Sequence, residues 1–565
     1  MTNKAESPTA TEATPPSTDD SWWKTAVFYQ IYPRSFQDST GSGMGDLAGI
    51  TAELDYLKSV GVDALWLSPF YPSPQVDAGY DVSDYCDVDP LFGSLTDFDT
   101  MLEEAHRRGL RVIIDLVPNH CSDQHPLFQA ALKAGPGSPE REMFHFVDGP
   151  GPGGDLPPSN WVSAFGGPSW TRVTEADGTP GQWYYHLFAP EQPDFNWENP
   201  KVMEFFKSVL RFWLDRGVDG FRIDVSDALI KDTAWPDHPE GLPAIPKDAD
   251  SPVHDIYREL RQVLNEYPGS MAVIETGAED EVVALFLRPG QMHQAFNFRF
   301  LKSPWDPKVL TTAIRESLDA YNHVGAPTTW VIDNHDSTRS LTRFARASSL
   351  TGAYVPEGAD LSPLSTDEEE LGRDRLRAMT LLYLALPGSA YIYAGQELGL
   401  PEVTDIPDEL LQDPIFFRTE GHLRGRDGCR VPLPWAGQRP PFGFGPGGDS
   451  DAPWLPQPEE WAALSVESQD LDPGSTLSLY RDMLALRRAN PALGTGELTW
   501  LQDASEAGSS KTIRALLTGP KGERVGVTVN FGTEPIAVNE GEVLLASSPL
   551  EDGELAPDSA AIVLL

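Results

Sequence analysis

The residues that first suggest chemistry lie in the stretch VDGFRIDVSDA, at positions 218–228 of the 565-residue chain. Apolar residues recur through it as in a buried strand, yet it also carries Arg222 and Asp224. An ionised side chain that is buried without a partner costs several kcal/mol. Because residues two apart in a strand share a face, Arg222 can hold Asp224 as a carboxylate and orient it. The pattern predicts that Asp224 is a nucleophile kept charged by Arg222.

Polar and charged residues also stand at the ends of other apolar runs. They are Asp81, Asn119, His120, Glu275, His335 and Asp336. One such residue by itself is ordinarily a strand-end or helix cap, but agreement across five runs favours a shared site. Three carboxyl groups meeting at one pocket, Asp224, Glu275 and Asp336, predict acid/base and nucleophilic chemistry on an acetal. Glu275 follows the apolar run MAVI, where desolvation should raise its pKa as a general acid requires.

Short β-rich runs alternate with amphipathic runs from Ala26 onward. The expected strands lie within residues 26–36, 62–70, 111–120, 218–224, 271–275, 291–300, 328–336 and 389–397. Helices are expected between them, for example near 46–60 and 96–109. Eight strands, each followed by a helix, predict an α/β fold, a (β/α)8 TIM barrel with right-handed crossovers. Chemistry in this architecture occurs at the carboxyl ends of the strands, so the polar residues above would share one mouth.

Two long segments interrupt the alternation of strands and helices. Residues 121–194, rich in Gly, Pro and Trp, predict an inserted domain B, and residues 397–475 separate strand eight from the last helix. Loops of this length are usually functional, and the aromatics of FGGPSWTRV and QWYYHLF are equally consistent with sugar-binding walls and with packing. After residue 492, short alternating runs predict a C-terminal antiparallel β-sandwich domain. The predicted organisation is a disordered tail at 1–20, the barrel at 21–120 and 195–491, domain B at 121–194 and the β-domain at 492–565.

The charge balance and the cysteines exclude several classes of function. The chain has 42 basic and 85 acidic residues, a net charge of −43 and a pI near 4.4. We expect no nucleic acid and no membrane as partner, because this charge repels phosphate backbones and anionic lipids. Three scattered cysteines provide neither a disulfide framework nor a metal-type cluster and indicate a reducing compartment. The N-terminal segment lacks the apolar core of a signal peptide, and Pro387 and Gly388 break the longest apolar run, so a soluble, cytoplasmic protein is predicted.

Seven segments between about residues 25 and 435 together resemble the α-amylase family, glycoside hydrolase family 13. They are DLVPNH, GFRIDV, VIET, IDNHD, GYDVSDY, QPDFNWENP and GRDGCRVPLPW. Within the family the chain is similar to the α-glucosidases and oligo-1,6-glucosidases. The resemblance implies that Asp224 is the nucleophile, Glu275 the acid/base, and Asp336 a third carboxylate that grips the sugar ring and favours the distorted transition state. It also implies that Asn119 supports the site from strand three.

The resemblance further implies a set of sugar-binding residues. They are Tyr80, Asp81, His120, Arg222, His335 and Arg430. Tyr80 would be a stacking platform, while His120, Arg222 and His335 would contact the sugar or the nucleophile. Asp81 and Arg430 would pair at the floor of the pocket and hold the non-reducing end of the glucose. Arg426 is an alternative partner for Asp81, and the sequence does not separate the two arginines.

The loop after strand one departs from the family pattern. Many relatives carry there an acidic loop of the form Asp-x-Asn-x-Asp-x-x-x-Asp, which binds calcium or magnesium through oxygen ligands. Here the loop is DSTGSGMGD, which keeps Asp38 and Asp46 but has Thr40 and Ser42 at the middle positions. Two carboxylates with two hydroxyls make only a weak Ca²⁺ or Mg²⁺ site, so neither a metal nor an organic cofactor is expected. A glycine-rich turn capped by Asp46 is an equally good interpretation.

The resulting prediction is a retaining, exo-acting α-glucosidase that hydrolyses short α-glucoside oligosaccharides and disaccharides through a covalent glucosyl-enzyme intermediate. The alternative is a glucosyl transferase or isomerase, for example a sucrose- or maltose-converting enzyme, in which an acceptor sugar replaces water. A non-catalytic accessory or transporter subunit is disfavoured, because both catalytic carboxylates are present. Val225 directly follows the nucleophile and would face the outgoing sugar. In the relatives that the chain resembles, valine there accompanies activity on α-1,6 links, so more than one linkage is expected.

Overall fold

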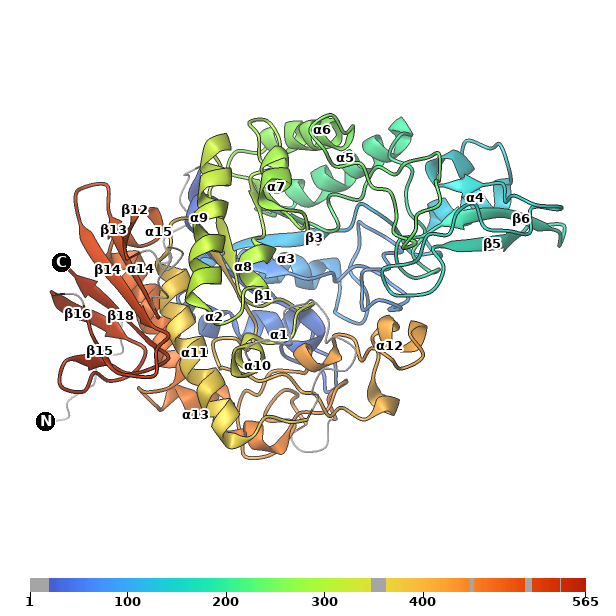
Figure 1. Cartoon of the computed structure of the whole chain (residues 1–565). Coiled ribbons are helices and arrows are strands. Elements are labelled where there is room, and N and C mark those ends of the chain that lie inside the picture. The colour runs from blue at the N-terminus through green and yellow to red at the C-terminus, as the bar shows by residue number, and fades with distance from the viewer. Residues whose placement is uncertain (1–19, 347–361, 448–451, 503–510, 539) are drawn as a thin grey trace, which may run out of the picture.

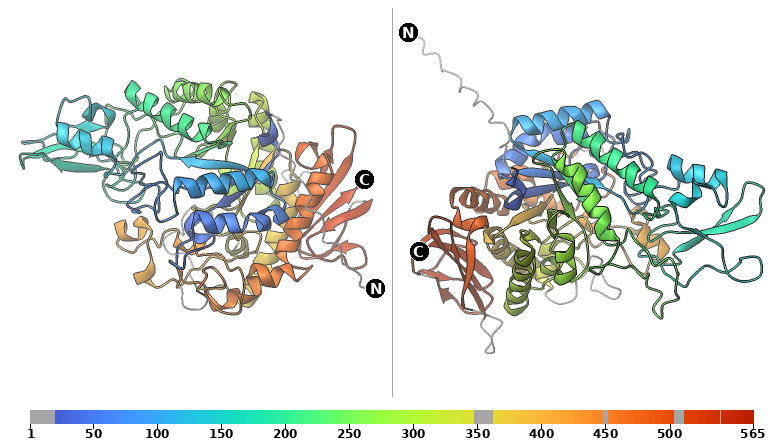
Figure 2. Two further views of the ribbon diagram at one scale, coloured as in Figure 1. Left: turned by 180° about the vertical axis from the view of Figure 1, so that it is seen from behind. Right: turned by 90° about the horizontal axis from the view of Figure 1, so that it is seen from above.

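The computed structural model describes residues 20–346, 362–447, 452–502, 511–538 and 540–565. The predicted tail at 1–20 lies outside the described residues except for Asp20. The described chain forms a central barrel, with a small sheet projecting on one side and a second sheet packed on the opposite side (Figure 1). Figure 2 shows the same elongated arrangement from behind and from above. No helix in these ranges is both long and apolar enough to cross a membrane.

In the described residues, eight parallel strands form the barrel, in the order β10-β11-β1-β2-β3-β7-β8-β9. They are β1 (Val27–Ile31), β2 (Ala64–Leu67), β3 (Arg111–Leu116), β7 (Gly220–Ile223), β8 (Met271–Ile274), β9 (Gln294–Ala295), β10 (Thr329–Val331) and β11 (Ser389–Tyr393). A parallel bridge between Phe296 and Thr329 connects the two outer strands. The rings of Trp66, Phe296 and Tyr391 pack against one another inside, so the barrel is a filled core. The predicted (β/α)8 fold is confirmed.

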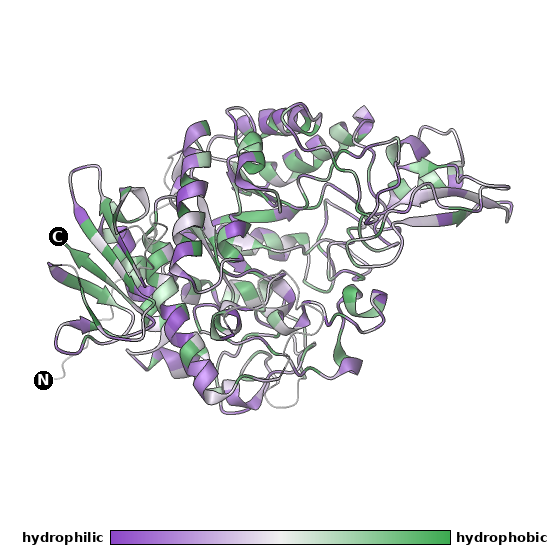
Figure 3. Cartoon of the chain, viewed as in Figure 1, coloured by the Kyte–Doolittle hydropathy of each residue, from purple (hydrophilic) through white to green (hydrophobic). Residues whose placement is uncertain are grey.

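Helices surround the barrel, and hydrophilic and hydrophobic residues alternate along them in Figure 3. These helices bury mostly apolar residues. They are α1 (Leu47–Ala52), α2 (Leu54–Val60), α3 (Leu95–Arg107), α5 (Pro200–Asp215), α6 (Val253–Asn265), α7 (Asp280–Phe286), α9 (Pro307–Val324), α11 (Thr366–Ala385) and α14 (Thr476–Ala489). The helix predicted near 46–60 is two helices, because Glu53 leaves helical geometry. The run 291–300 is mostly not strand, since the Asn297 side chain accepts from the Phe300 N–H and begins the short helix α8 (Phe298–Leu301).

The inserted segment between β3 and α5 contains α4 (Pro126–Ala134) and a small antiparallel sheet. Its strands are β4 (Phe146–Val147), β5 (Trp170–Thr174) and β6 (Pro180–Tyr185), with β6 in the centre. The long segment after β11 contains α12 (Pro414–Arg418) and α13 (Val466–Asp470). Arg418 at the end of α12 donates to the Gly166 carbonyl of the inserted segment at 2.6 Å. The two long segments therefore meet beside the mouth of the barrel.

A five-stranded antiparallel sheet follows the barrel at the C-terminal end, as predicted. Its strands are β12 (Glu497–Gln502), β13 (Thr512–Thr518), β14 (Arg524–Asn530), β18 (Ser559–Leu564) and β16 (Glu542–Ala546), in that order, and β15 (Ile536–Ala537) pairs separately with β17 (Glu554–Leu555). The sheet packs on α11, where Arg375 forms an ion pair with Asp558 at 3.0 Å. It lies on the side of the barrel away from the inserted segment (Figure 1), so it supports the barrel without reaching its mouth.

Candidate active site

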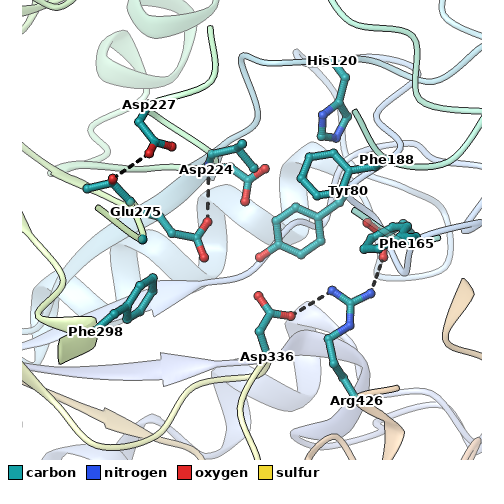
Figure 4. Close-up of a pocket in the computed structure, with 14 residues that line it drawn as sticks. Tyr80, His120, Phe165, Phe188, Asp224, Asp227, Glu275, Phe298, Asp336 and Arg426 are labelled. Carbon is teal, nitrogen blue, oxygen red and sulfur yellow. Dashed lines mark hydrogen bonds and ion pairs between the residues drawn. The ribbon is translucent and has the colours of Figure 1, made fainter. Parts of the chain in front are cut away.

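A cavity of about 210 Å³ opens where the barrel strands end. It is lined by Asp77, Tyr80, His120, Phe165, Phe188, Asp224, Val225, Asp227, Glu275, Thr276, Gly277, Phe298, Asp336 and Arg426. Figure 4 shows Asp224, Glu275 and Asp336 facing this cavity from three sides. Asp224 directly follows β7 and Glu275 directly follows β8. The structure therefore brings together the three carboxyl groups predicted from the sequence.

Arg222 joins the carboxyl groups of three neighbouring strands. Its guanidinium is fully buried, and Nη1 contacts Asp115 Oδ1 at 2.5 Å and Asp224 Oδ1 at 2.7 Å. Nη2 contacts Glu275 Oε2 at 2.5 Å. The predicted pairing of Arg222 with Asp224 is thus present, and the same cation also holds Glu275. Arg222 does not line the cavity itself, so it reaches the cavity only through these carboxyl groups.

Asp224 and Glu275 contact the same guanidinium and lie beside each other. Burial raises the pKa of Asp224 well above its usual range, Arg222 opposes the rise, and the adjacent Glu275 adds to it. Arg222 therefore opposes the protonation of Asp224 that burial favours, as the sequence pattern predicted for this pair.

Asp336 is the carboxyl group that stays ionised. Burial opposes its ionisation, but the positive charges of Arg426 and Arg430 hold its pKa far below the usual range. Arg430 approaches Asp336 Oδ1 at 2.7 Å and Arg426 approaches the same oxygen at 3.0 Å. An anion placed beside a sugar ring can stabilise positive charge that develops there during cleavage.

Tyr80 lines the cavity, and His335 lies behind it. The two rings stack with centroids 5.4 Å apart and an interplanar angle of 8°. The Tyr80 hydroxyl is 2.7 Å from His335 Nε2, and Gln30 lies 2.7 Å from Nδ1 of the same imidazole. Since burial lowers the pKa of His335 well below its usual value, the ring is neutral. His335 therefore fixes the Tyr80 ring and is not itself part of the cavity wall.

His120 reaches the cavity from the end of β3, and a buried network supports it. Asn119 donates from Nδ2 to Asp194 at 3.0 Å and accepts from Lys231 Nζ at 2.7 Å. Lys231 and Asp194 form a fully buried ion pair at 2.8 Å. Burial and the charge of Lys231 lower the pKa of His120 to about 3, so its imidazole is neutral. Asn119 occupies the supporting position predicted for it.

The predicted pairing of Asp81 with Arg430 is wrong, because Asp77 and Arg426 form the ion pair at the cavity wall, at 2.8 Å. Asp81 is fully buried, and its carboxylate accepts from the backbone N–H groups of Val76 and Asp77 at 2.9 and 3.0 Å. The Asp81 carboxylate therefore stabilises the conformation of its own loop. Arg430 instead contacts Asp336 and donates to the His335 carbonyl at 2.8 Å.

Arg426 contacts two carboxylates besides Asp77, namely Asp413 at 2.6 Å and Asp336 at 3.0 Å. Burial nevertheless raises the pKa of Asp77 to about 6, against the opposing charge of Arg426. The sequence analysis named both arginines as candidates for this ion pair, but it did not name Asp77 as the acidic partner. The feature of the sequence that could have indicated Asp77 is its position in the same loop, four residues before Asp81.

Three phenylalanines that the sequence did not single out individually form apolar walls. Phe165 and Phe188 come from the inserted segment, where they belong to the aromatic runs FGGPSWTRV and QWYYHLF. Phe298 is the first residue of α8. The Arg426 guanidinium lies over the Phe165 ring, 5.1 Å from its centroid. Phe165 and Arg426 lie together at one end of the cavity, and Phe298 and Asp227 lie toward the other (Figure 4). Such apolar walls exclude water from the carboxyl groups between them.

The loop after β1 is organised by the hydrogen bonds that Asp38 and Asp46 accept. Asp38 accepts from the N–H groups of Thr40, Gly41 and Gly43 at 2.7–2.8 Å. Asp46 caps α1 by accepting from the Gly49 N–H at 2.7 Å, and its other oxygen accepts from Ser39. Protein donors therefore occupy both carboxylates, which does not fit a metal-ligand role for this loop as folded.

Most of the chain is similar to a known protein family, to curated relatives and to solved structures. Residues 30–496 match the family model for the alpha-amylase catalytic domain. A probable alpha-glucosidase of Rhizobium meliloti (strain 1021) is 38% identical over 510 residues, which cover 86% of each chain. A trehalose-6-phosphate hydrolase of Escherichia coli (strain K12) is 35% identical over 505 residues, covering 84% of this chain and 85% of that one. The crystal structure of the alpha-glucosyl transfer enzyme XgtA has a TM-score of 0.78 and 33% identity, covering 97% of this chain and 100% of its own.

Proposed function

The chain belongs to the α-amylase family of glycoside hydrolases, and from this membership we propose that it is a retaining, exo-acting α-glucosidase. Its substrates would be short α-glucosides, from which it releases the terminal non-reducing glucose. One observation carries the proposal: Asp224 and Glu275, joined by Arg222, face Asp336 across a cavity that the Asp77–Arg426 pair bounds at one end.

The proposed chemistry has two steps. In the first, an Asp224 oxygen attacks the anomeric carbon while Glu275 gives its proton to the glycosidic oxygen. The bond to the leaving sugar breaks and a glucosyl ester of Asp224 forms. In the second, Glu275 takes a proton from water, the water oxygen attacks the same carbon, and Asp224 is released. Asp336, held ionised by its arginines, would stabilise the positive charge at the ring in both steps.

The closed end of the cavity supports exo action. Arg426 is anchored by three carboxylates and covered by Phe165, and the Arg418–Gly166 contact joins the two long segments beside it. A glucan chain could not extend past this end without breaking buried ion pairs. The terminal glucose would therefore bind against Asp77 and Arg426, with the rest of the substrate directed toward Asp227 and Phe298.

The test is hydrolysis of maltose, isomaltose, sucrose and trehalose, with NMR of the first-formed glucose. We expect cleavage of at least one of these disaccharides and initial release of the α-anomer, because two inversions retain configuration. Initial β-anomer, or release of long internal fragments from starch, would contradict the proposal. The likeness to XgtA favours transfer to a sugar acceptor as a second candidate activity, and product analysis at high substrate concentration would detect it.

A further inference from the structure

One carboxylate in the cavity has no part in the proposed chemistry. Asp227 lies three residues after Asp224 and lines the cavity with Thr276, Gly277 and Phe298. In Figure 4 it lies beyond Glu275, on the side of the catalytic carboxyl groups away from Arg426. If the terminal glucose binds at the Arg426 end, the group that leaves must lie on the side of Asp227.

Asp227 is held rigidly but keeps one free oxygen. Its Oδ2 accepts from Thr276 Oγ1 at 3.0 Å and from Lys247 Nζ at 3.1 Å. Thr276 Oγ1 in turn accepts from the Ala278 N–H at 3.1 Å, which fixes the hydroxyl. Both polar contacts of the carboxylate use Oδ2, and within the described ranges Oδ1 has no hydrogen-bond partner. The side chain is 15% exposed and lines the cavity, where a ligand can meet it.

The backbone fixes Asp227 relative to the acid/base. The Ser226 N–H donates to the Glu275 carbonyl at 3.0 Å, and the Val225 N–H donates to Glu275 Oε2 at 3.3 Å. Hydrogen bonds therefore join the segment 224–227 to the segment 275–276. Because Glu275 would protonate the oxygen of the leaving group, Asp227 Oδ1 is placed to meet hydroxyls on that same group.

The charges around the cavity are unfavourable for an anionic leaving group. In the described part of the chain, the lining residues with ionisable acidic side chains are Asp77, Asp224, Asp227, Glu275 and Asp336, and the lining cation is Arg426. Arg426 is already occupied by three carboxylates at the closed end. Lys247 lies near the open end but pairs with Asp227 at 3.1 Å. A phosphate on the leaving sugar would meet Asp227 without an uncommitted cation beside it.

Resting on the proposed function, we propose that Asp227 selects the leaving sugar. Its Oδ1 accepts a hydrogen bond from a hydroxyl of an uncharged leaving sugar, and its charge excludes a phosphorylated one. The enzyme then acts on neutral disaccharides and discriminates against disaccharide phosphates. Asp227 is a specificity-determining residue, because the reacting atoms are handled by Asp224 and Glu275.

The test compares three substrates in wild type and variants: the preferred neutral disaccharide, trehalose 6-phosphate, and p-nitrophenyl α-glucoside, whose leaving group has no sugar hydroxyl. Wild type should cleave trehalose 6-phosphate at least about tenfold less efficiently than the neutral disaccharide. Asp227→Ala should lower kcat/KM for the disaccharide about ten- to a hundredfold more than for the aryl glucoside, the range for losing a hydrogen bond to a charged group. Turnover of the aryl glucoside by the variant shows that it folds.

Two further variants separate charge from hydrogen bonding. Asp227→Asn keeps an acceptor but removes the charge, so it should retain more disaccharide activity than Asp227→Ala and discriminate several-fold less against the phosphate. Asp250→Asn removes one charge from an exposed position near Lys247 in the same loop and should change neither ratio.

Three results would overturn the inference. Equal losses on the disaccharide and the aryl glucoside in Asp227→Ala would indicate a structural role only. A wild-type preference for trehalose 6-phosphate that Lys247→Ala abolishes would make Lys247 a phosphate ligand and reverse the proposed selection. A wild-type enzyme inactive on every glucoside would remove the proposed function and this inference together, whereas the first two results require an active enzyme and remove the inference alone.

Discussion

Replacement of Asp77 by asparagine should stabilise the protein at neutral pH while weakening catalysis. Burial raises the pKa of this carboxyl from 3.8 to about 6, so the fold prefers its protonated form. The stability that this preference contributes is fully present below the unfolded-state pKa and is lost as pH rises through about 6. At pH 7.5 ionised Asp77 therefore costs the fold about 3 kcal/mol, from about two pKa units at about 1.4 kcal/mol each.

Asparagine is the appropriate replacement because it has the shape of the protonated carboxyl and no charge. Arg426 would keep Asp413 at 2.6 Å and Asp336 at 3.0 Å, so its own charge stays compensated. We expect Asp77→Asn to gain up to about 3 kcal/mol of unfolding free energy at pH 7.5, seen as a rise of a few degrees in Tm. The gain should shrink below pH 6 and vanish near pH 4. The kcat/KM should fall, because the carboxylate against which the terminal glucose is proposed to bind is gone.

The assay is thermal unfolding of wild type, Asp77→Asn and Asp87→Asn between pH 4 and 7.5. Asp87 is exposed in the same segment, so its replacement controls for the change in net charge. A lower Tm for Asp77→Asn at pH 7.5 would show that the Asp77–Arg426 ion pair is net stabilising. A gain of equal size at both ends of the pH range would show that ionisation of Asp77 is not its source. Either result refutes the reasoning.

Asp224→Asn and Glu275→Gln should each abolish most turnover while the protein stays folded, and near-normal hydrolysis by either variant would reject their assigned roles. Val225→Thr should shift the ratio of kcat/KM values several-fold toward maltose over isomaltose, since one hydrogen bond is worth about 1 kcal/mol; an unchanged ratio would assign linkage choice to the long loops. Chelation of divalent ions should leave Tm nearly unchanged, because protein donors occupy Asp38 and Asp46. A large loss of Tm that calcium restores would show that the protein binds a structural metal ion.

The sequence predicted the barrel and its three carboxyl groups because both depend on local patterns. An apolar run that ends in a charged residue indicates a buried strand whose end lies at the mouth of the barrel. The strands β7 and β8 end in this way, directly before Asp224 and Glu275. Asn297 shows where the same pattern misleads. The run 291–300 is apolar enough for a strand, yet one side-chain cap turns its second half into α8.

The choice between Asp77 and Asp81 could not be made from local pattern. Both lie in one loop, four residues apart, and only the path of that loop decides which carboxylate binds backbone N–H groups and which remains free. The protonation of the carboxyl groups could not be predicted from local pattern either. Burial and the neighbouring Glu275 raise the pKa of Asp224, and that rise depends on distances between side chains of different strands, which a local pattern does not contain. The walls formed by Phe165 and Phe188 likewise depend on how a long segment folds back over the barrel.

Two buried arginines, Arg222 and Arg426, each bind a different group of carboxylates in the site. Arg222 holds the carboxyl groups that would break and form bonds, and Arg426 holds the closed end, each through three carboxylates at 3.0 Å or less. Removing either cation would leave several buried acids unpaired, at a cost of about 3–5 kcal/mol, so neither position can vary freely. Asp227 is different, since its partner Lys247 is 42% exposed and its second oxygen is free. Selection of the leaving sugar can therefore change at the open end without disturbing the chemistry that both arginines hold in place.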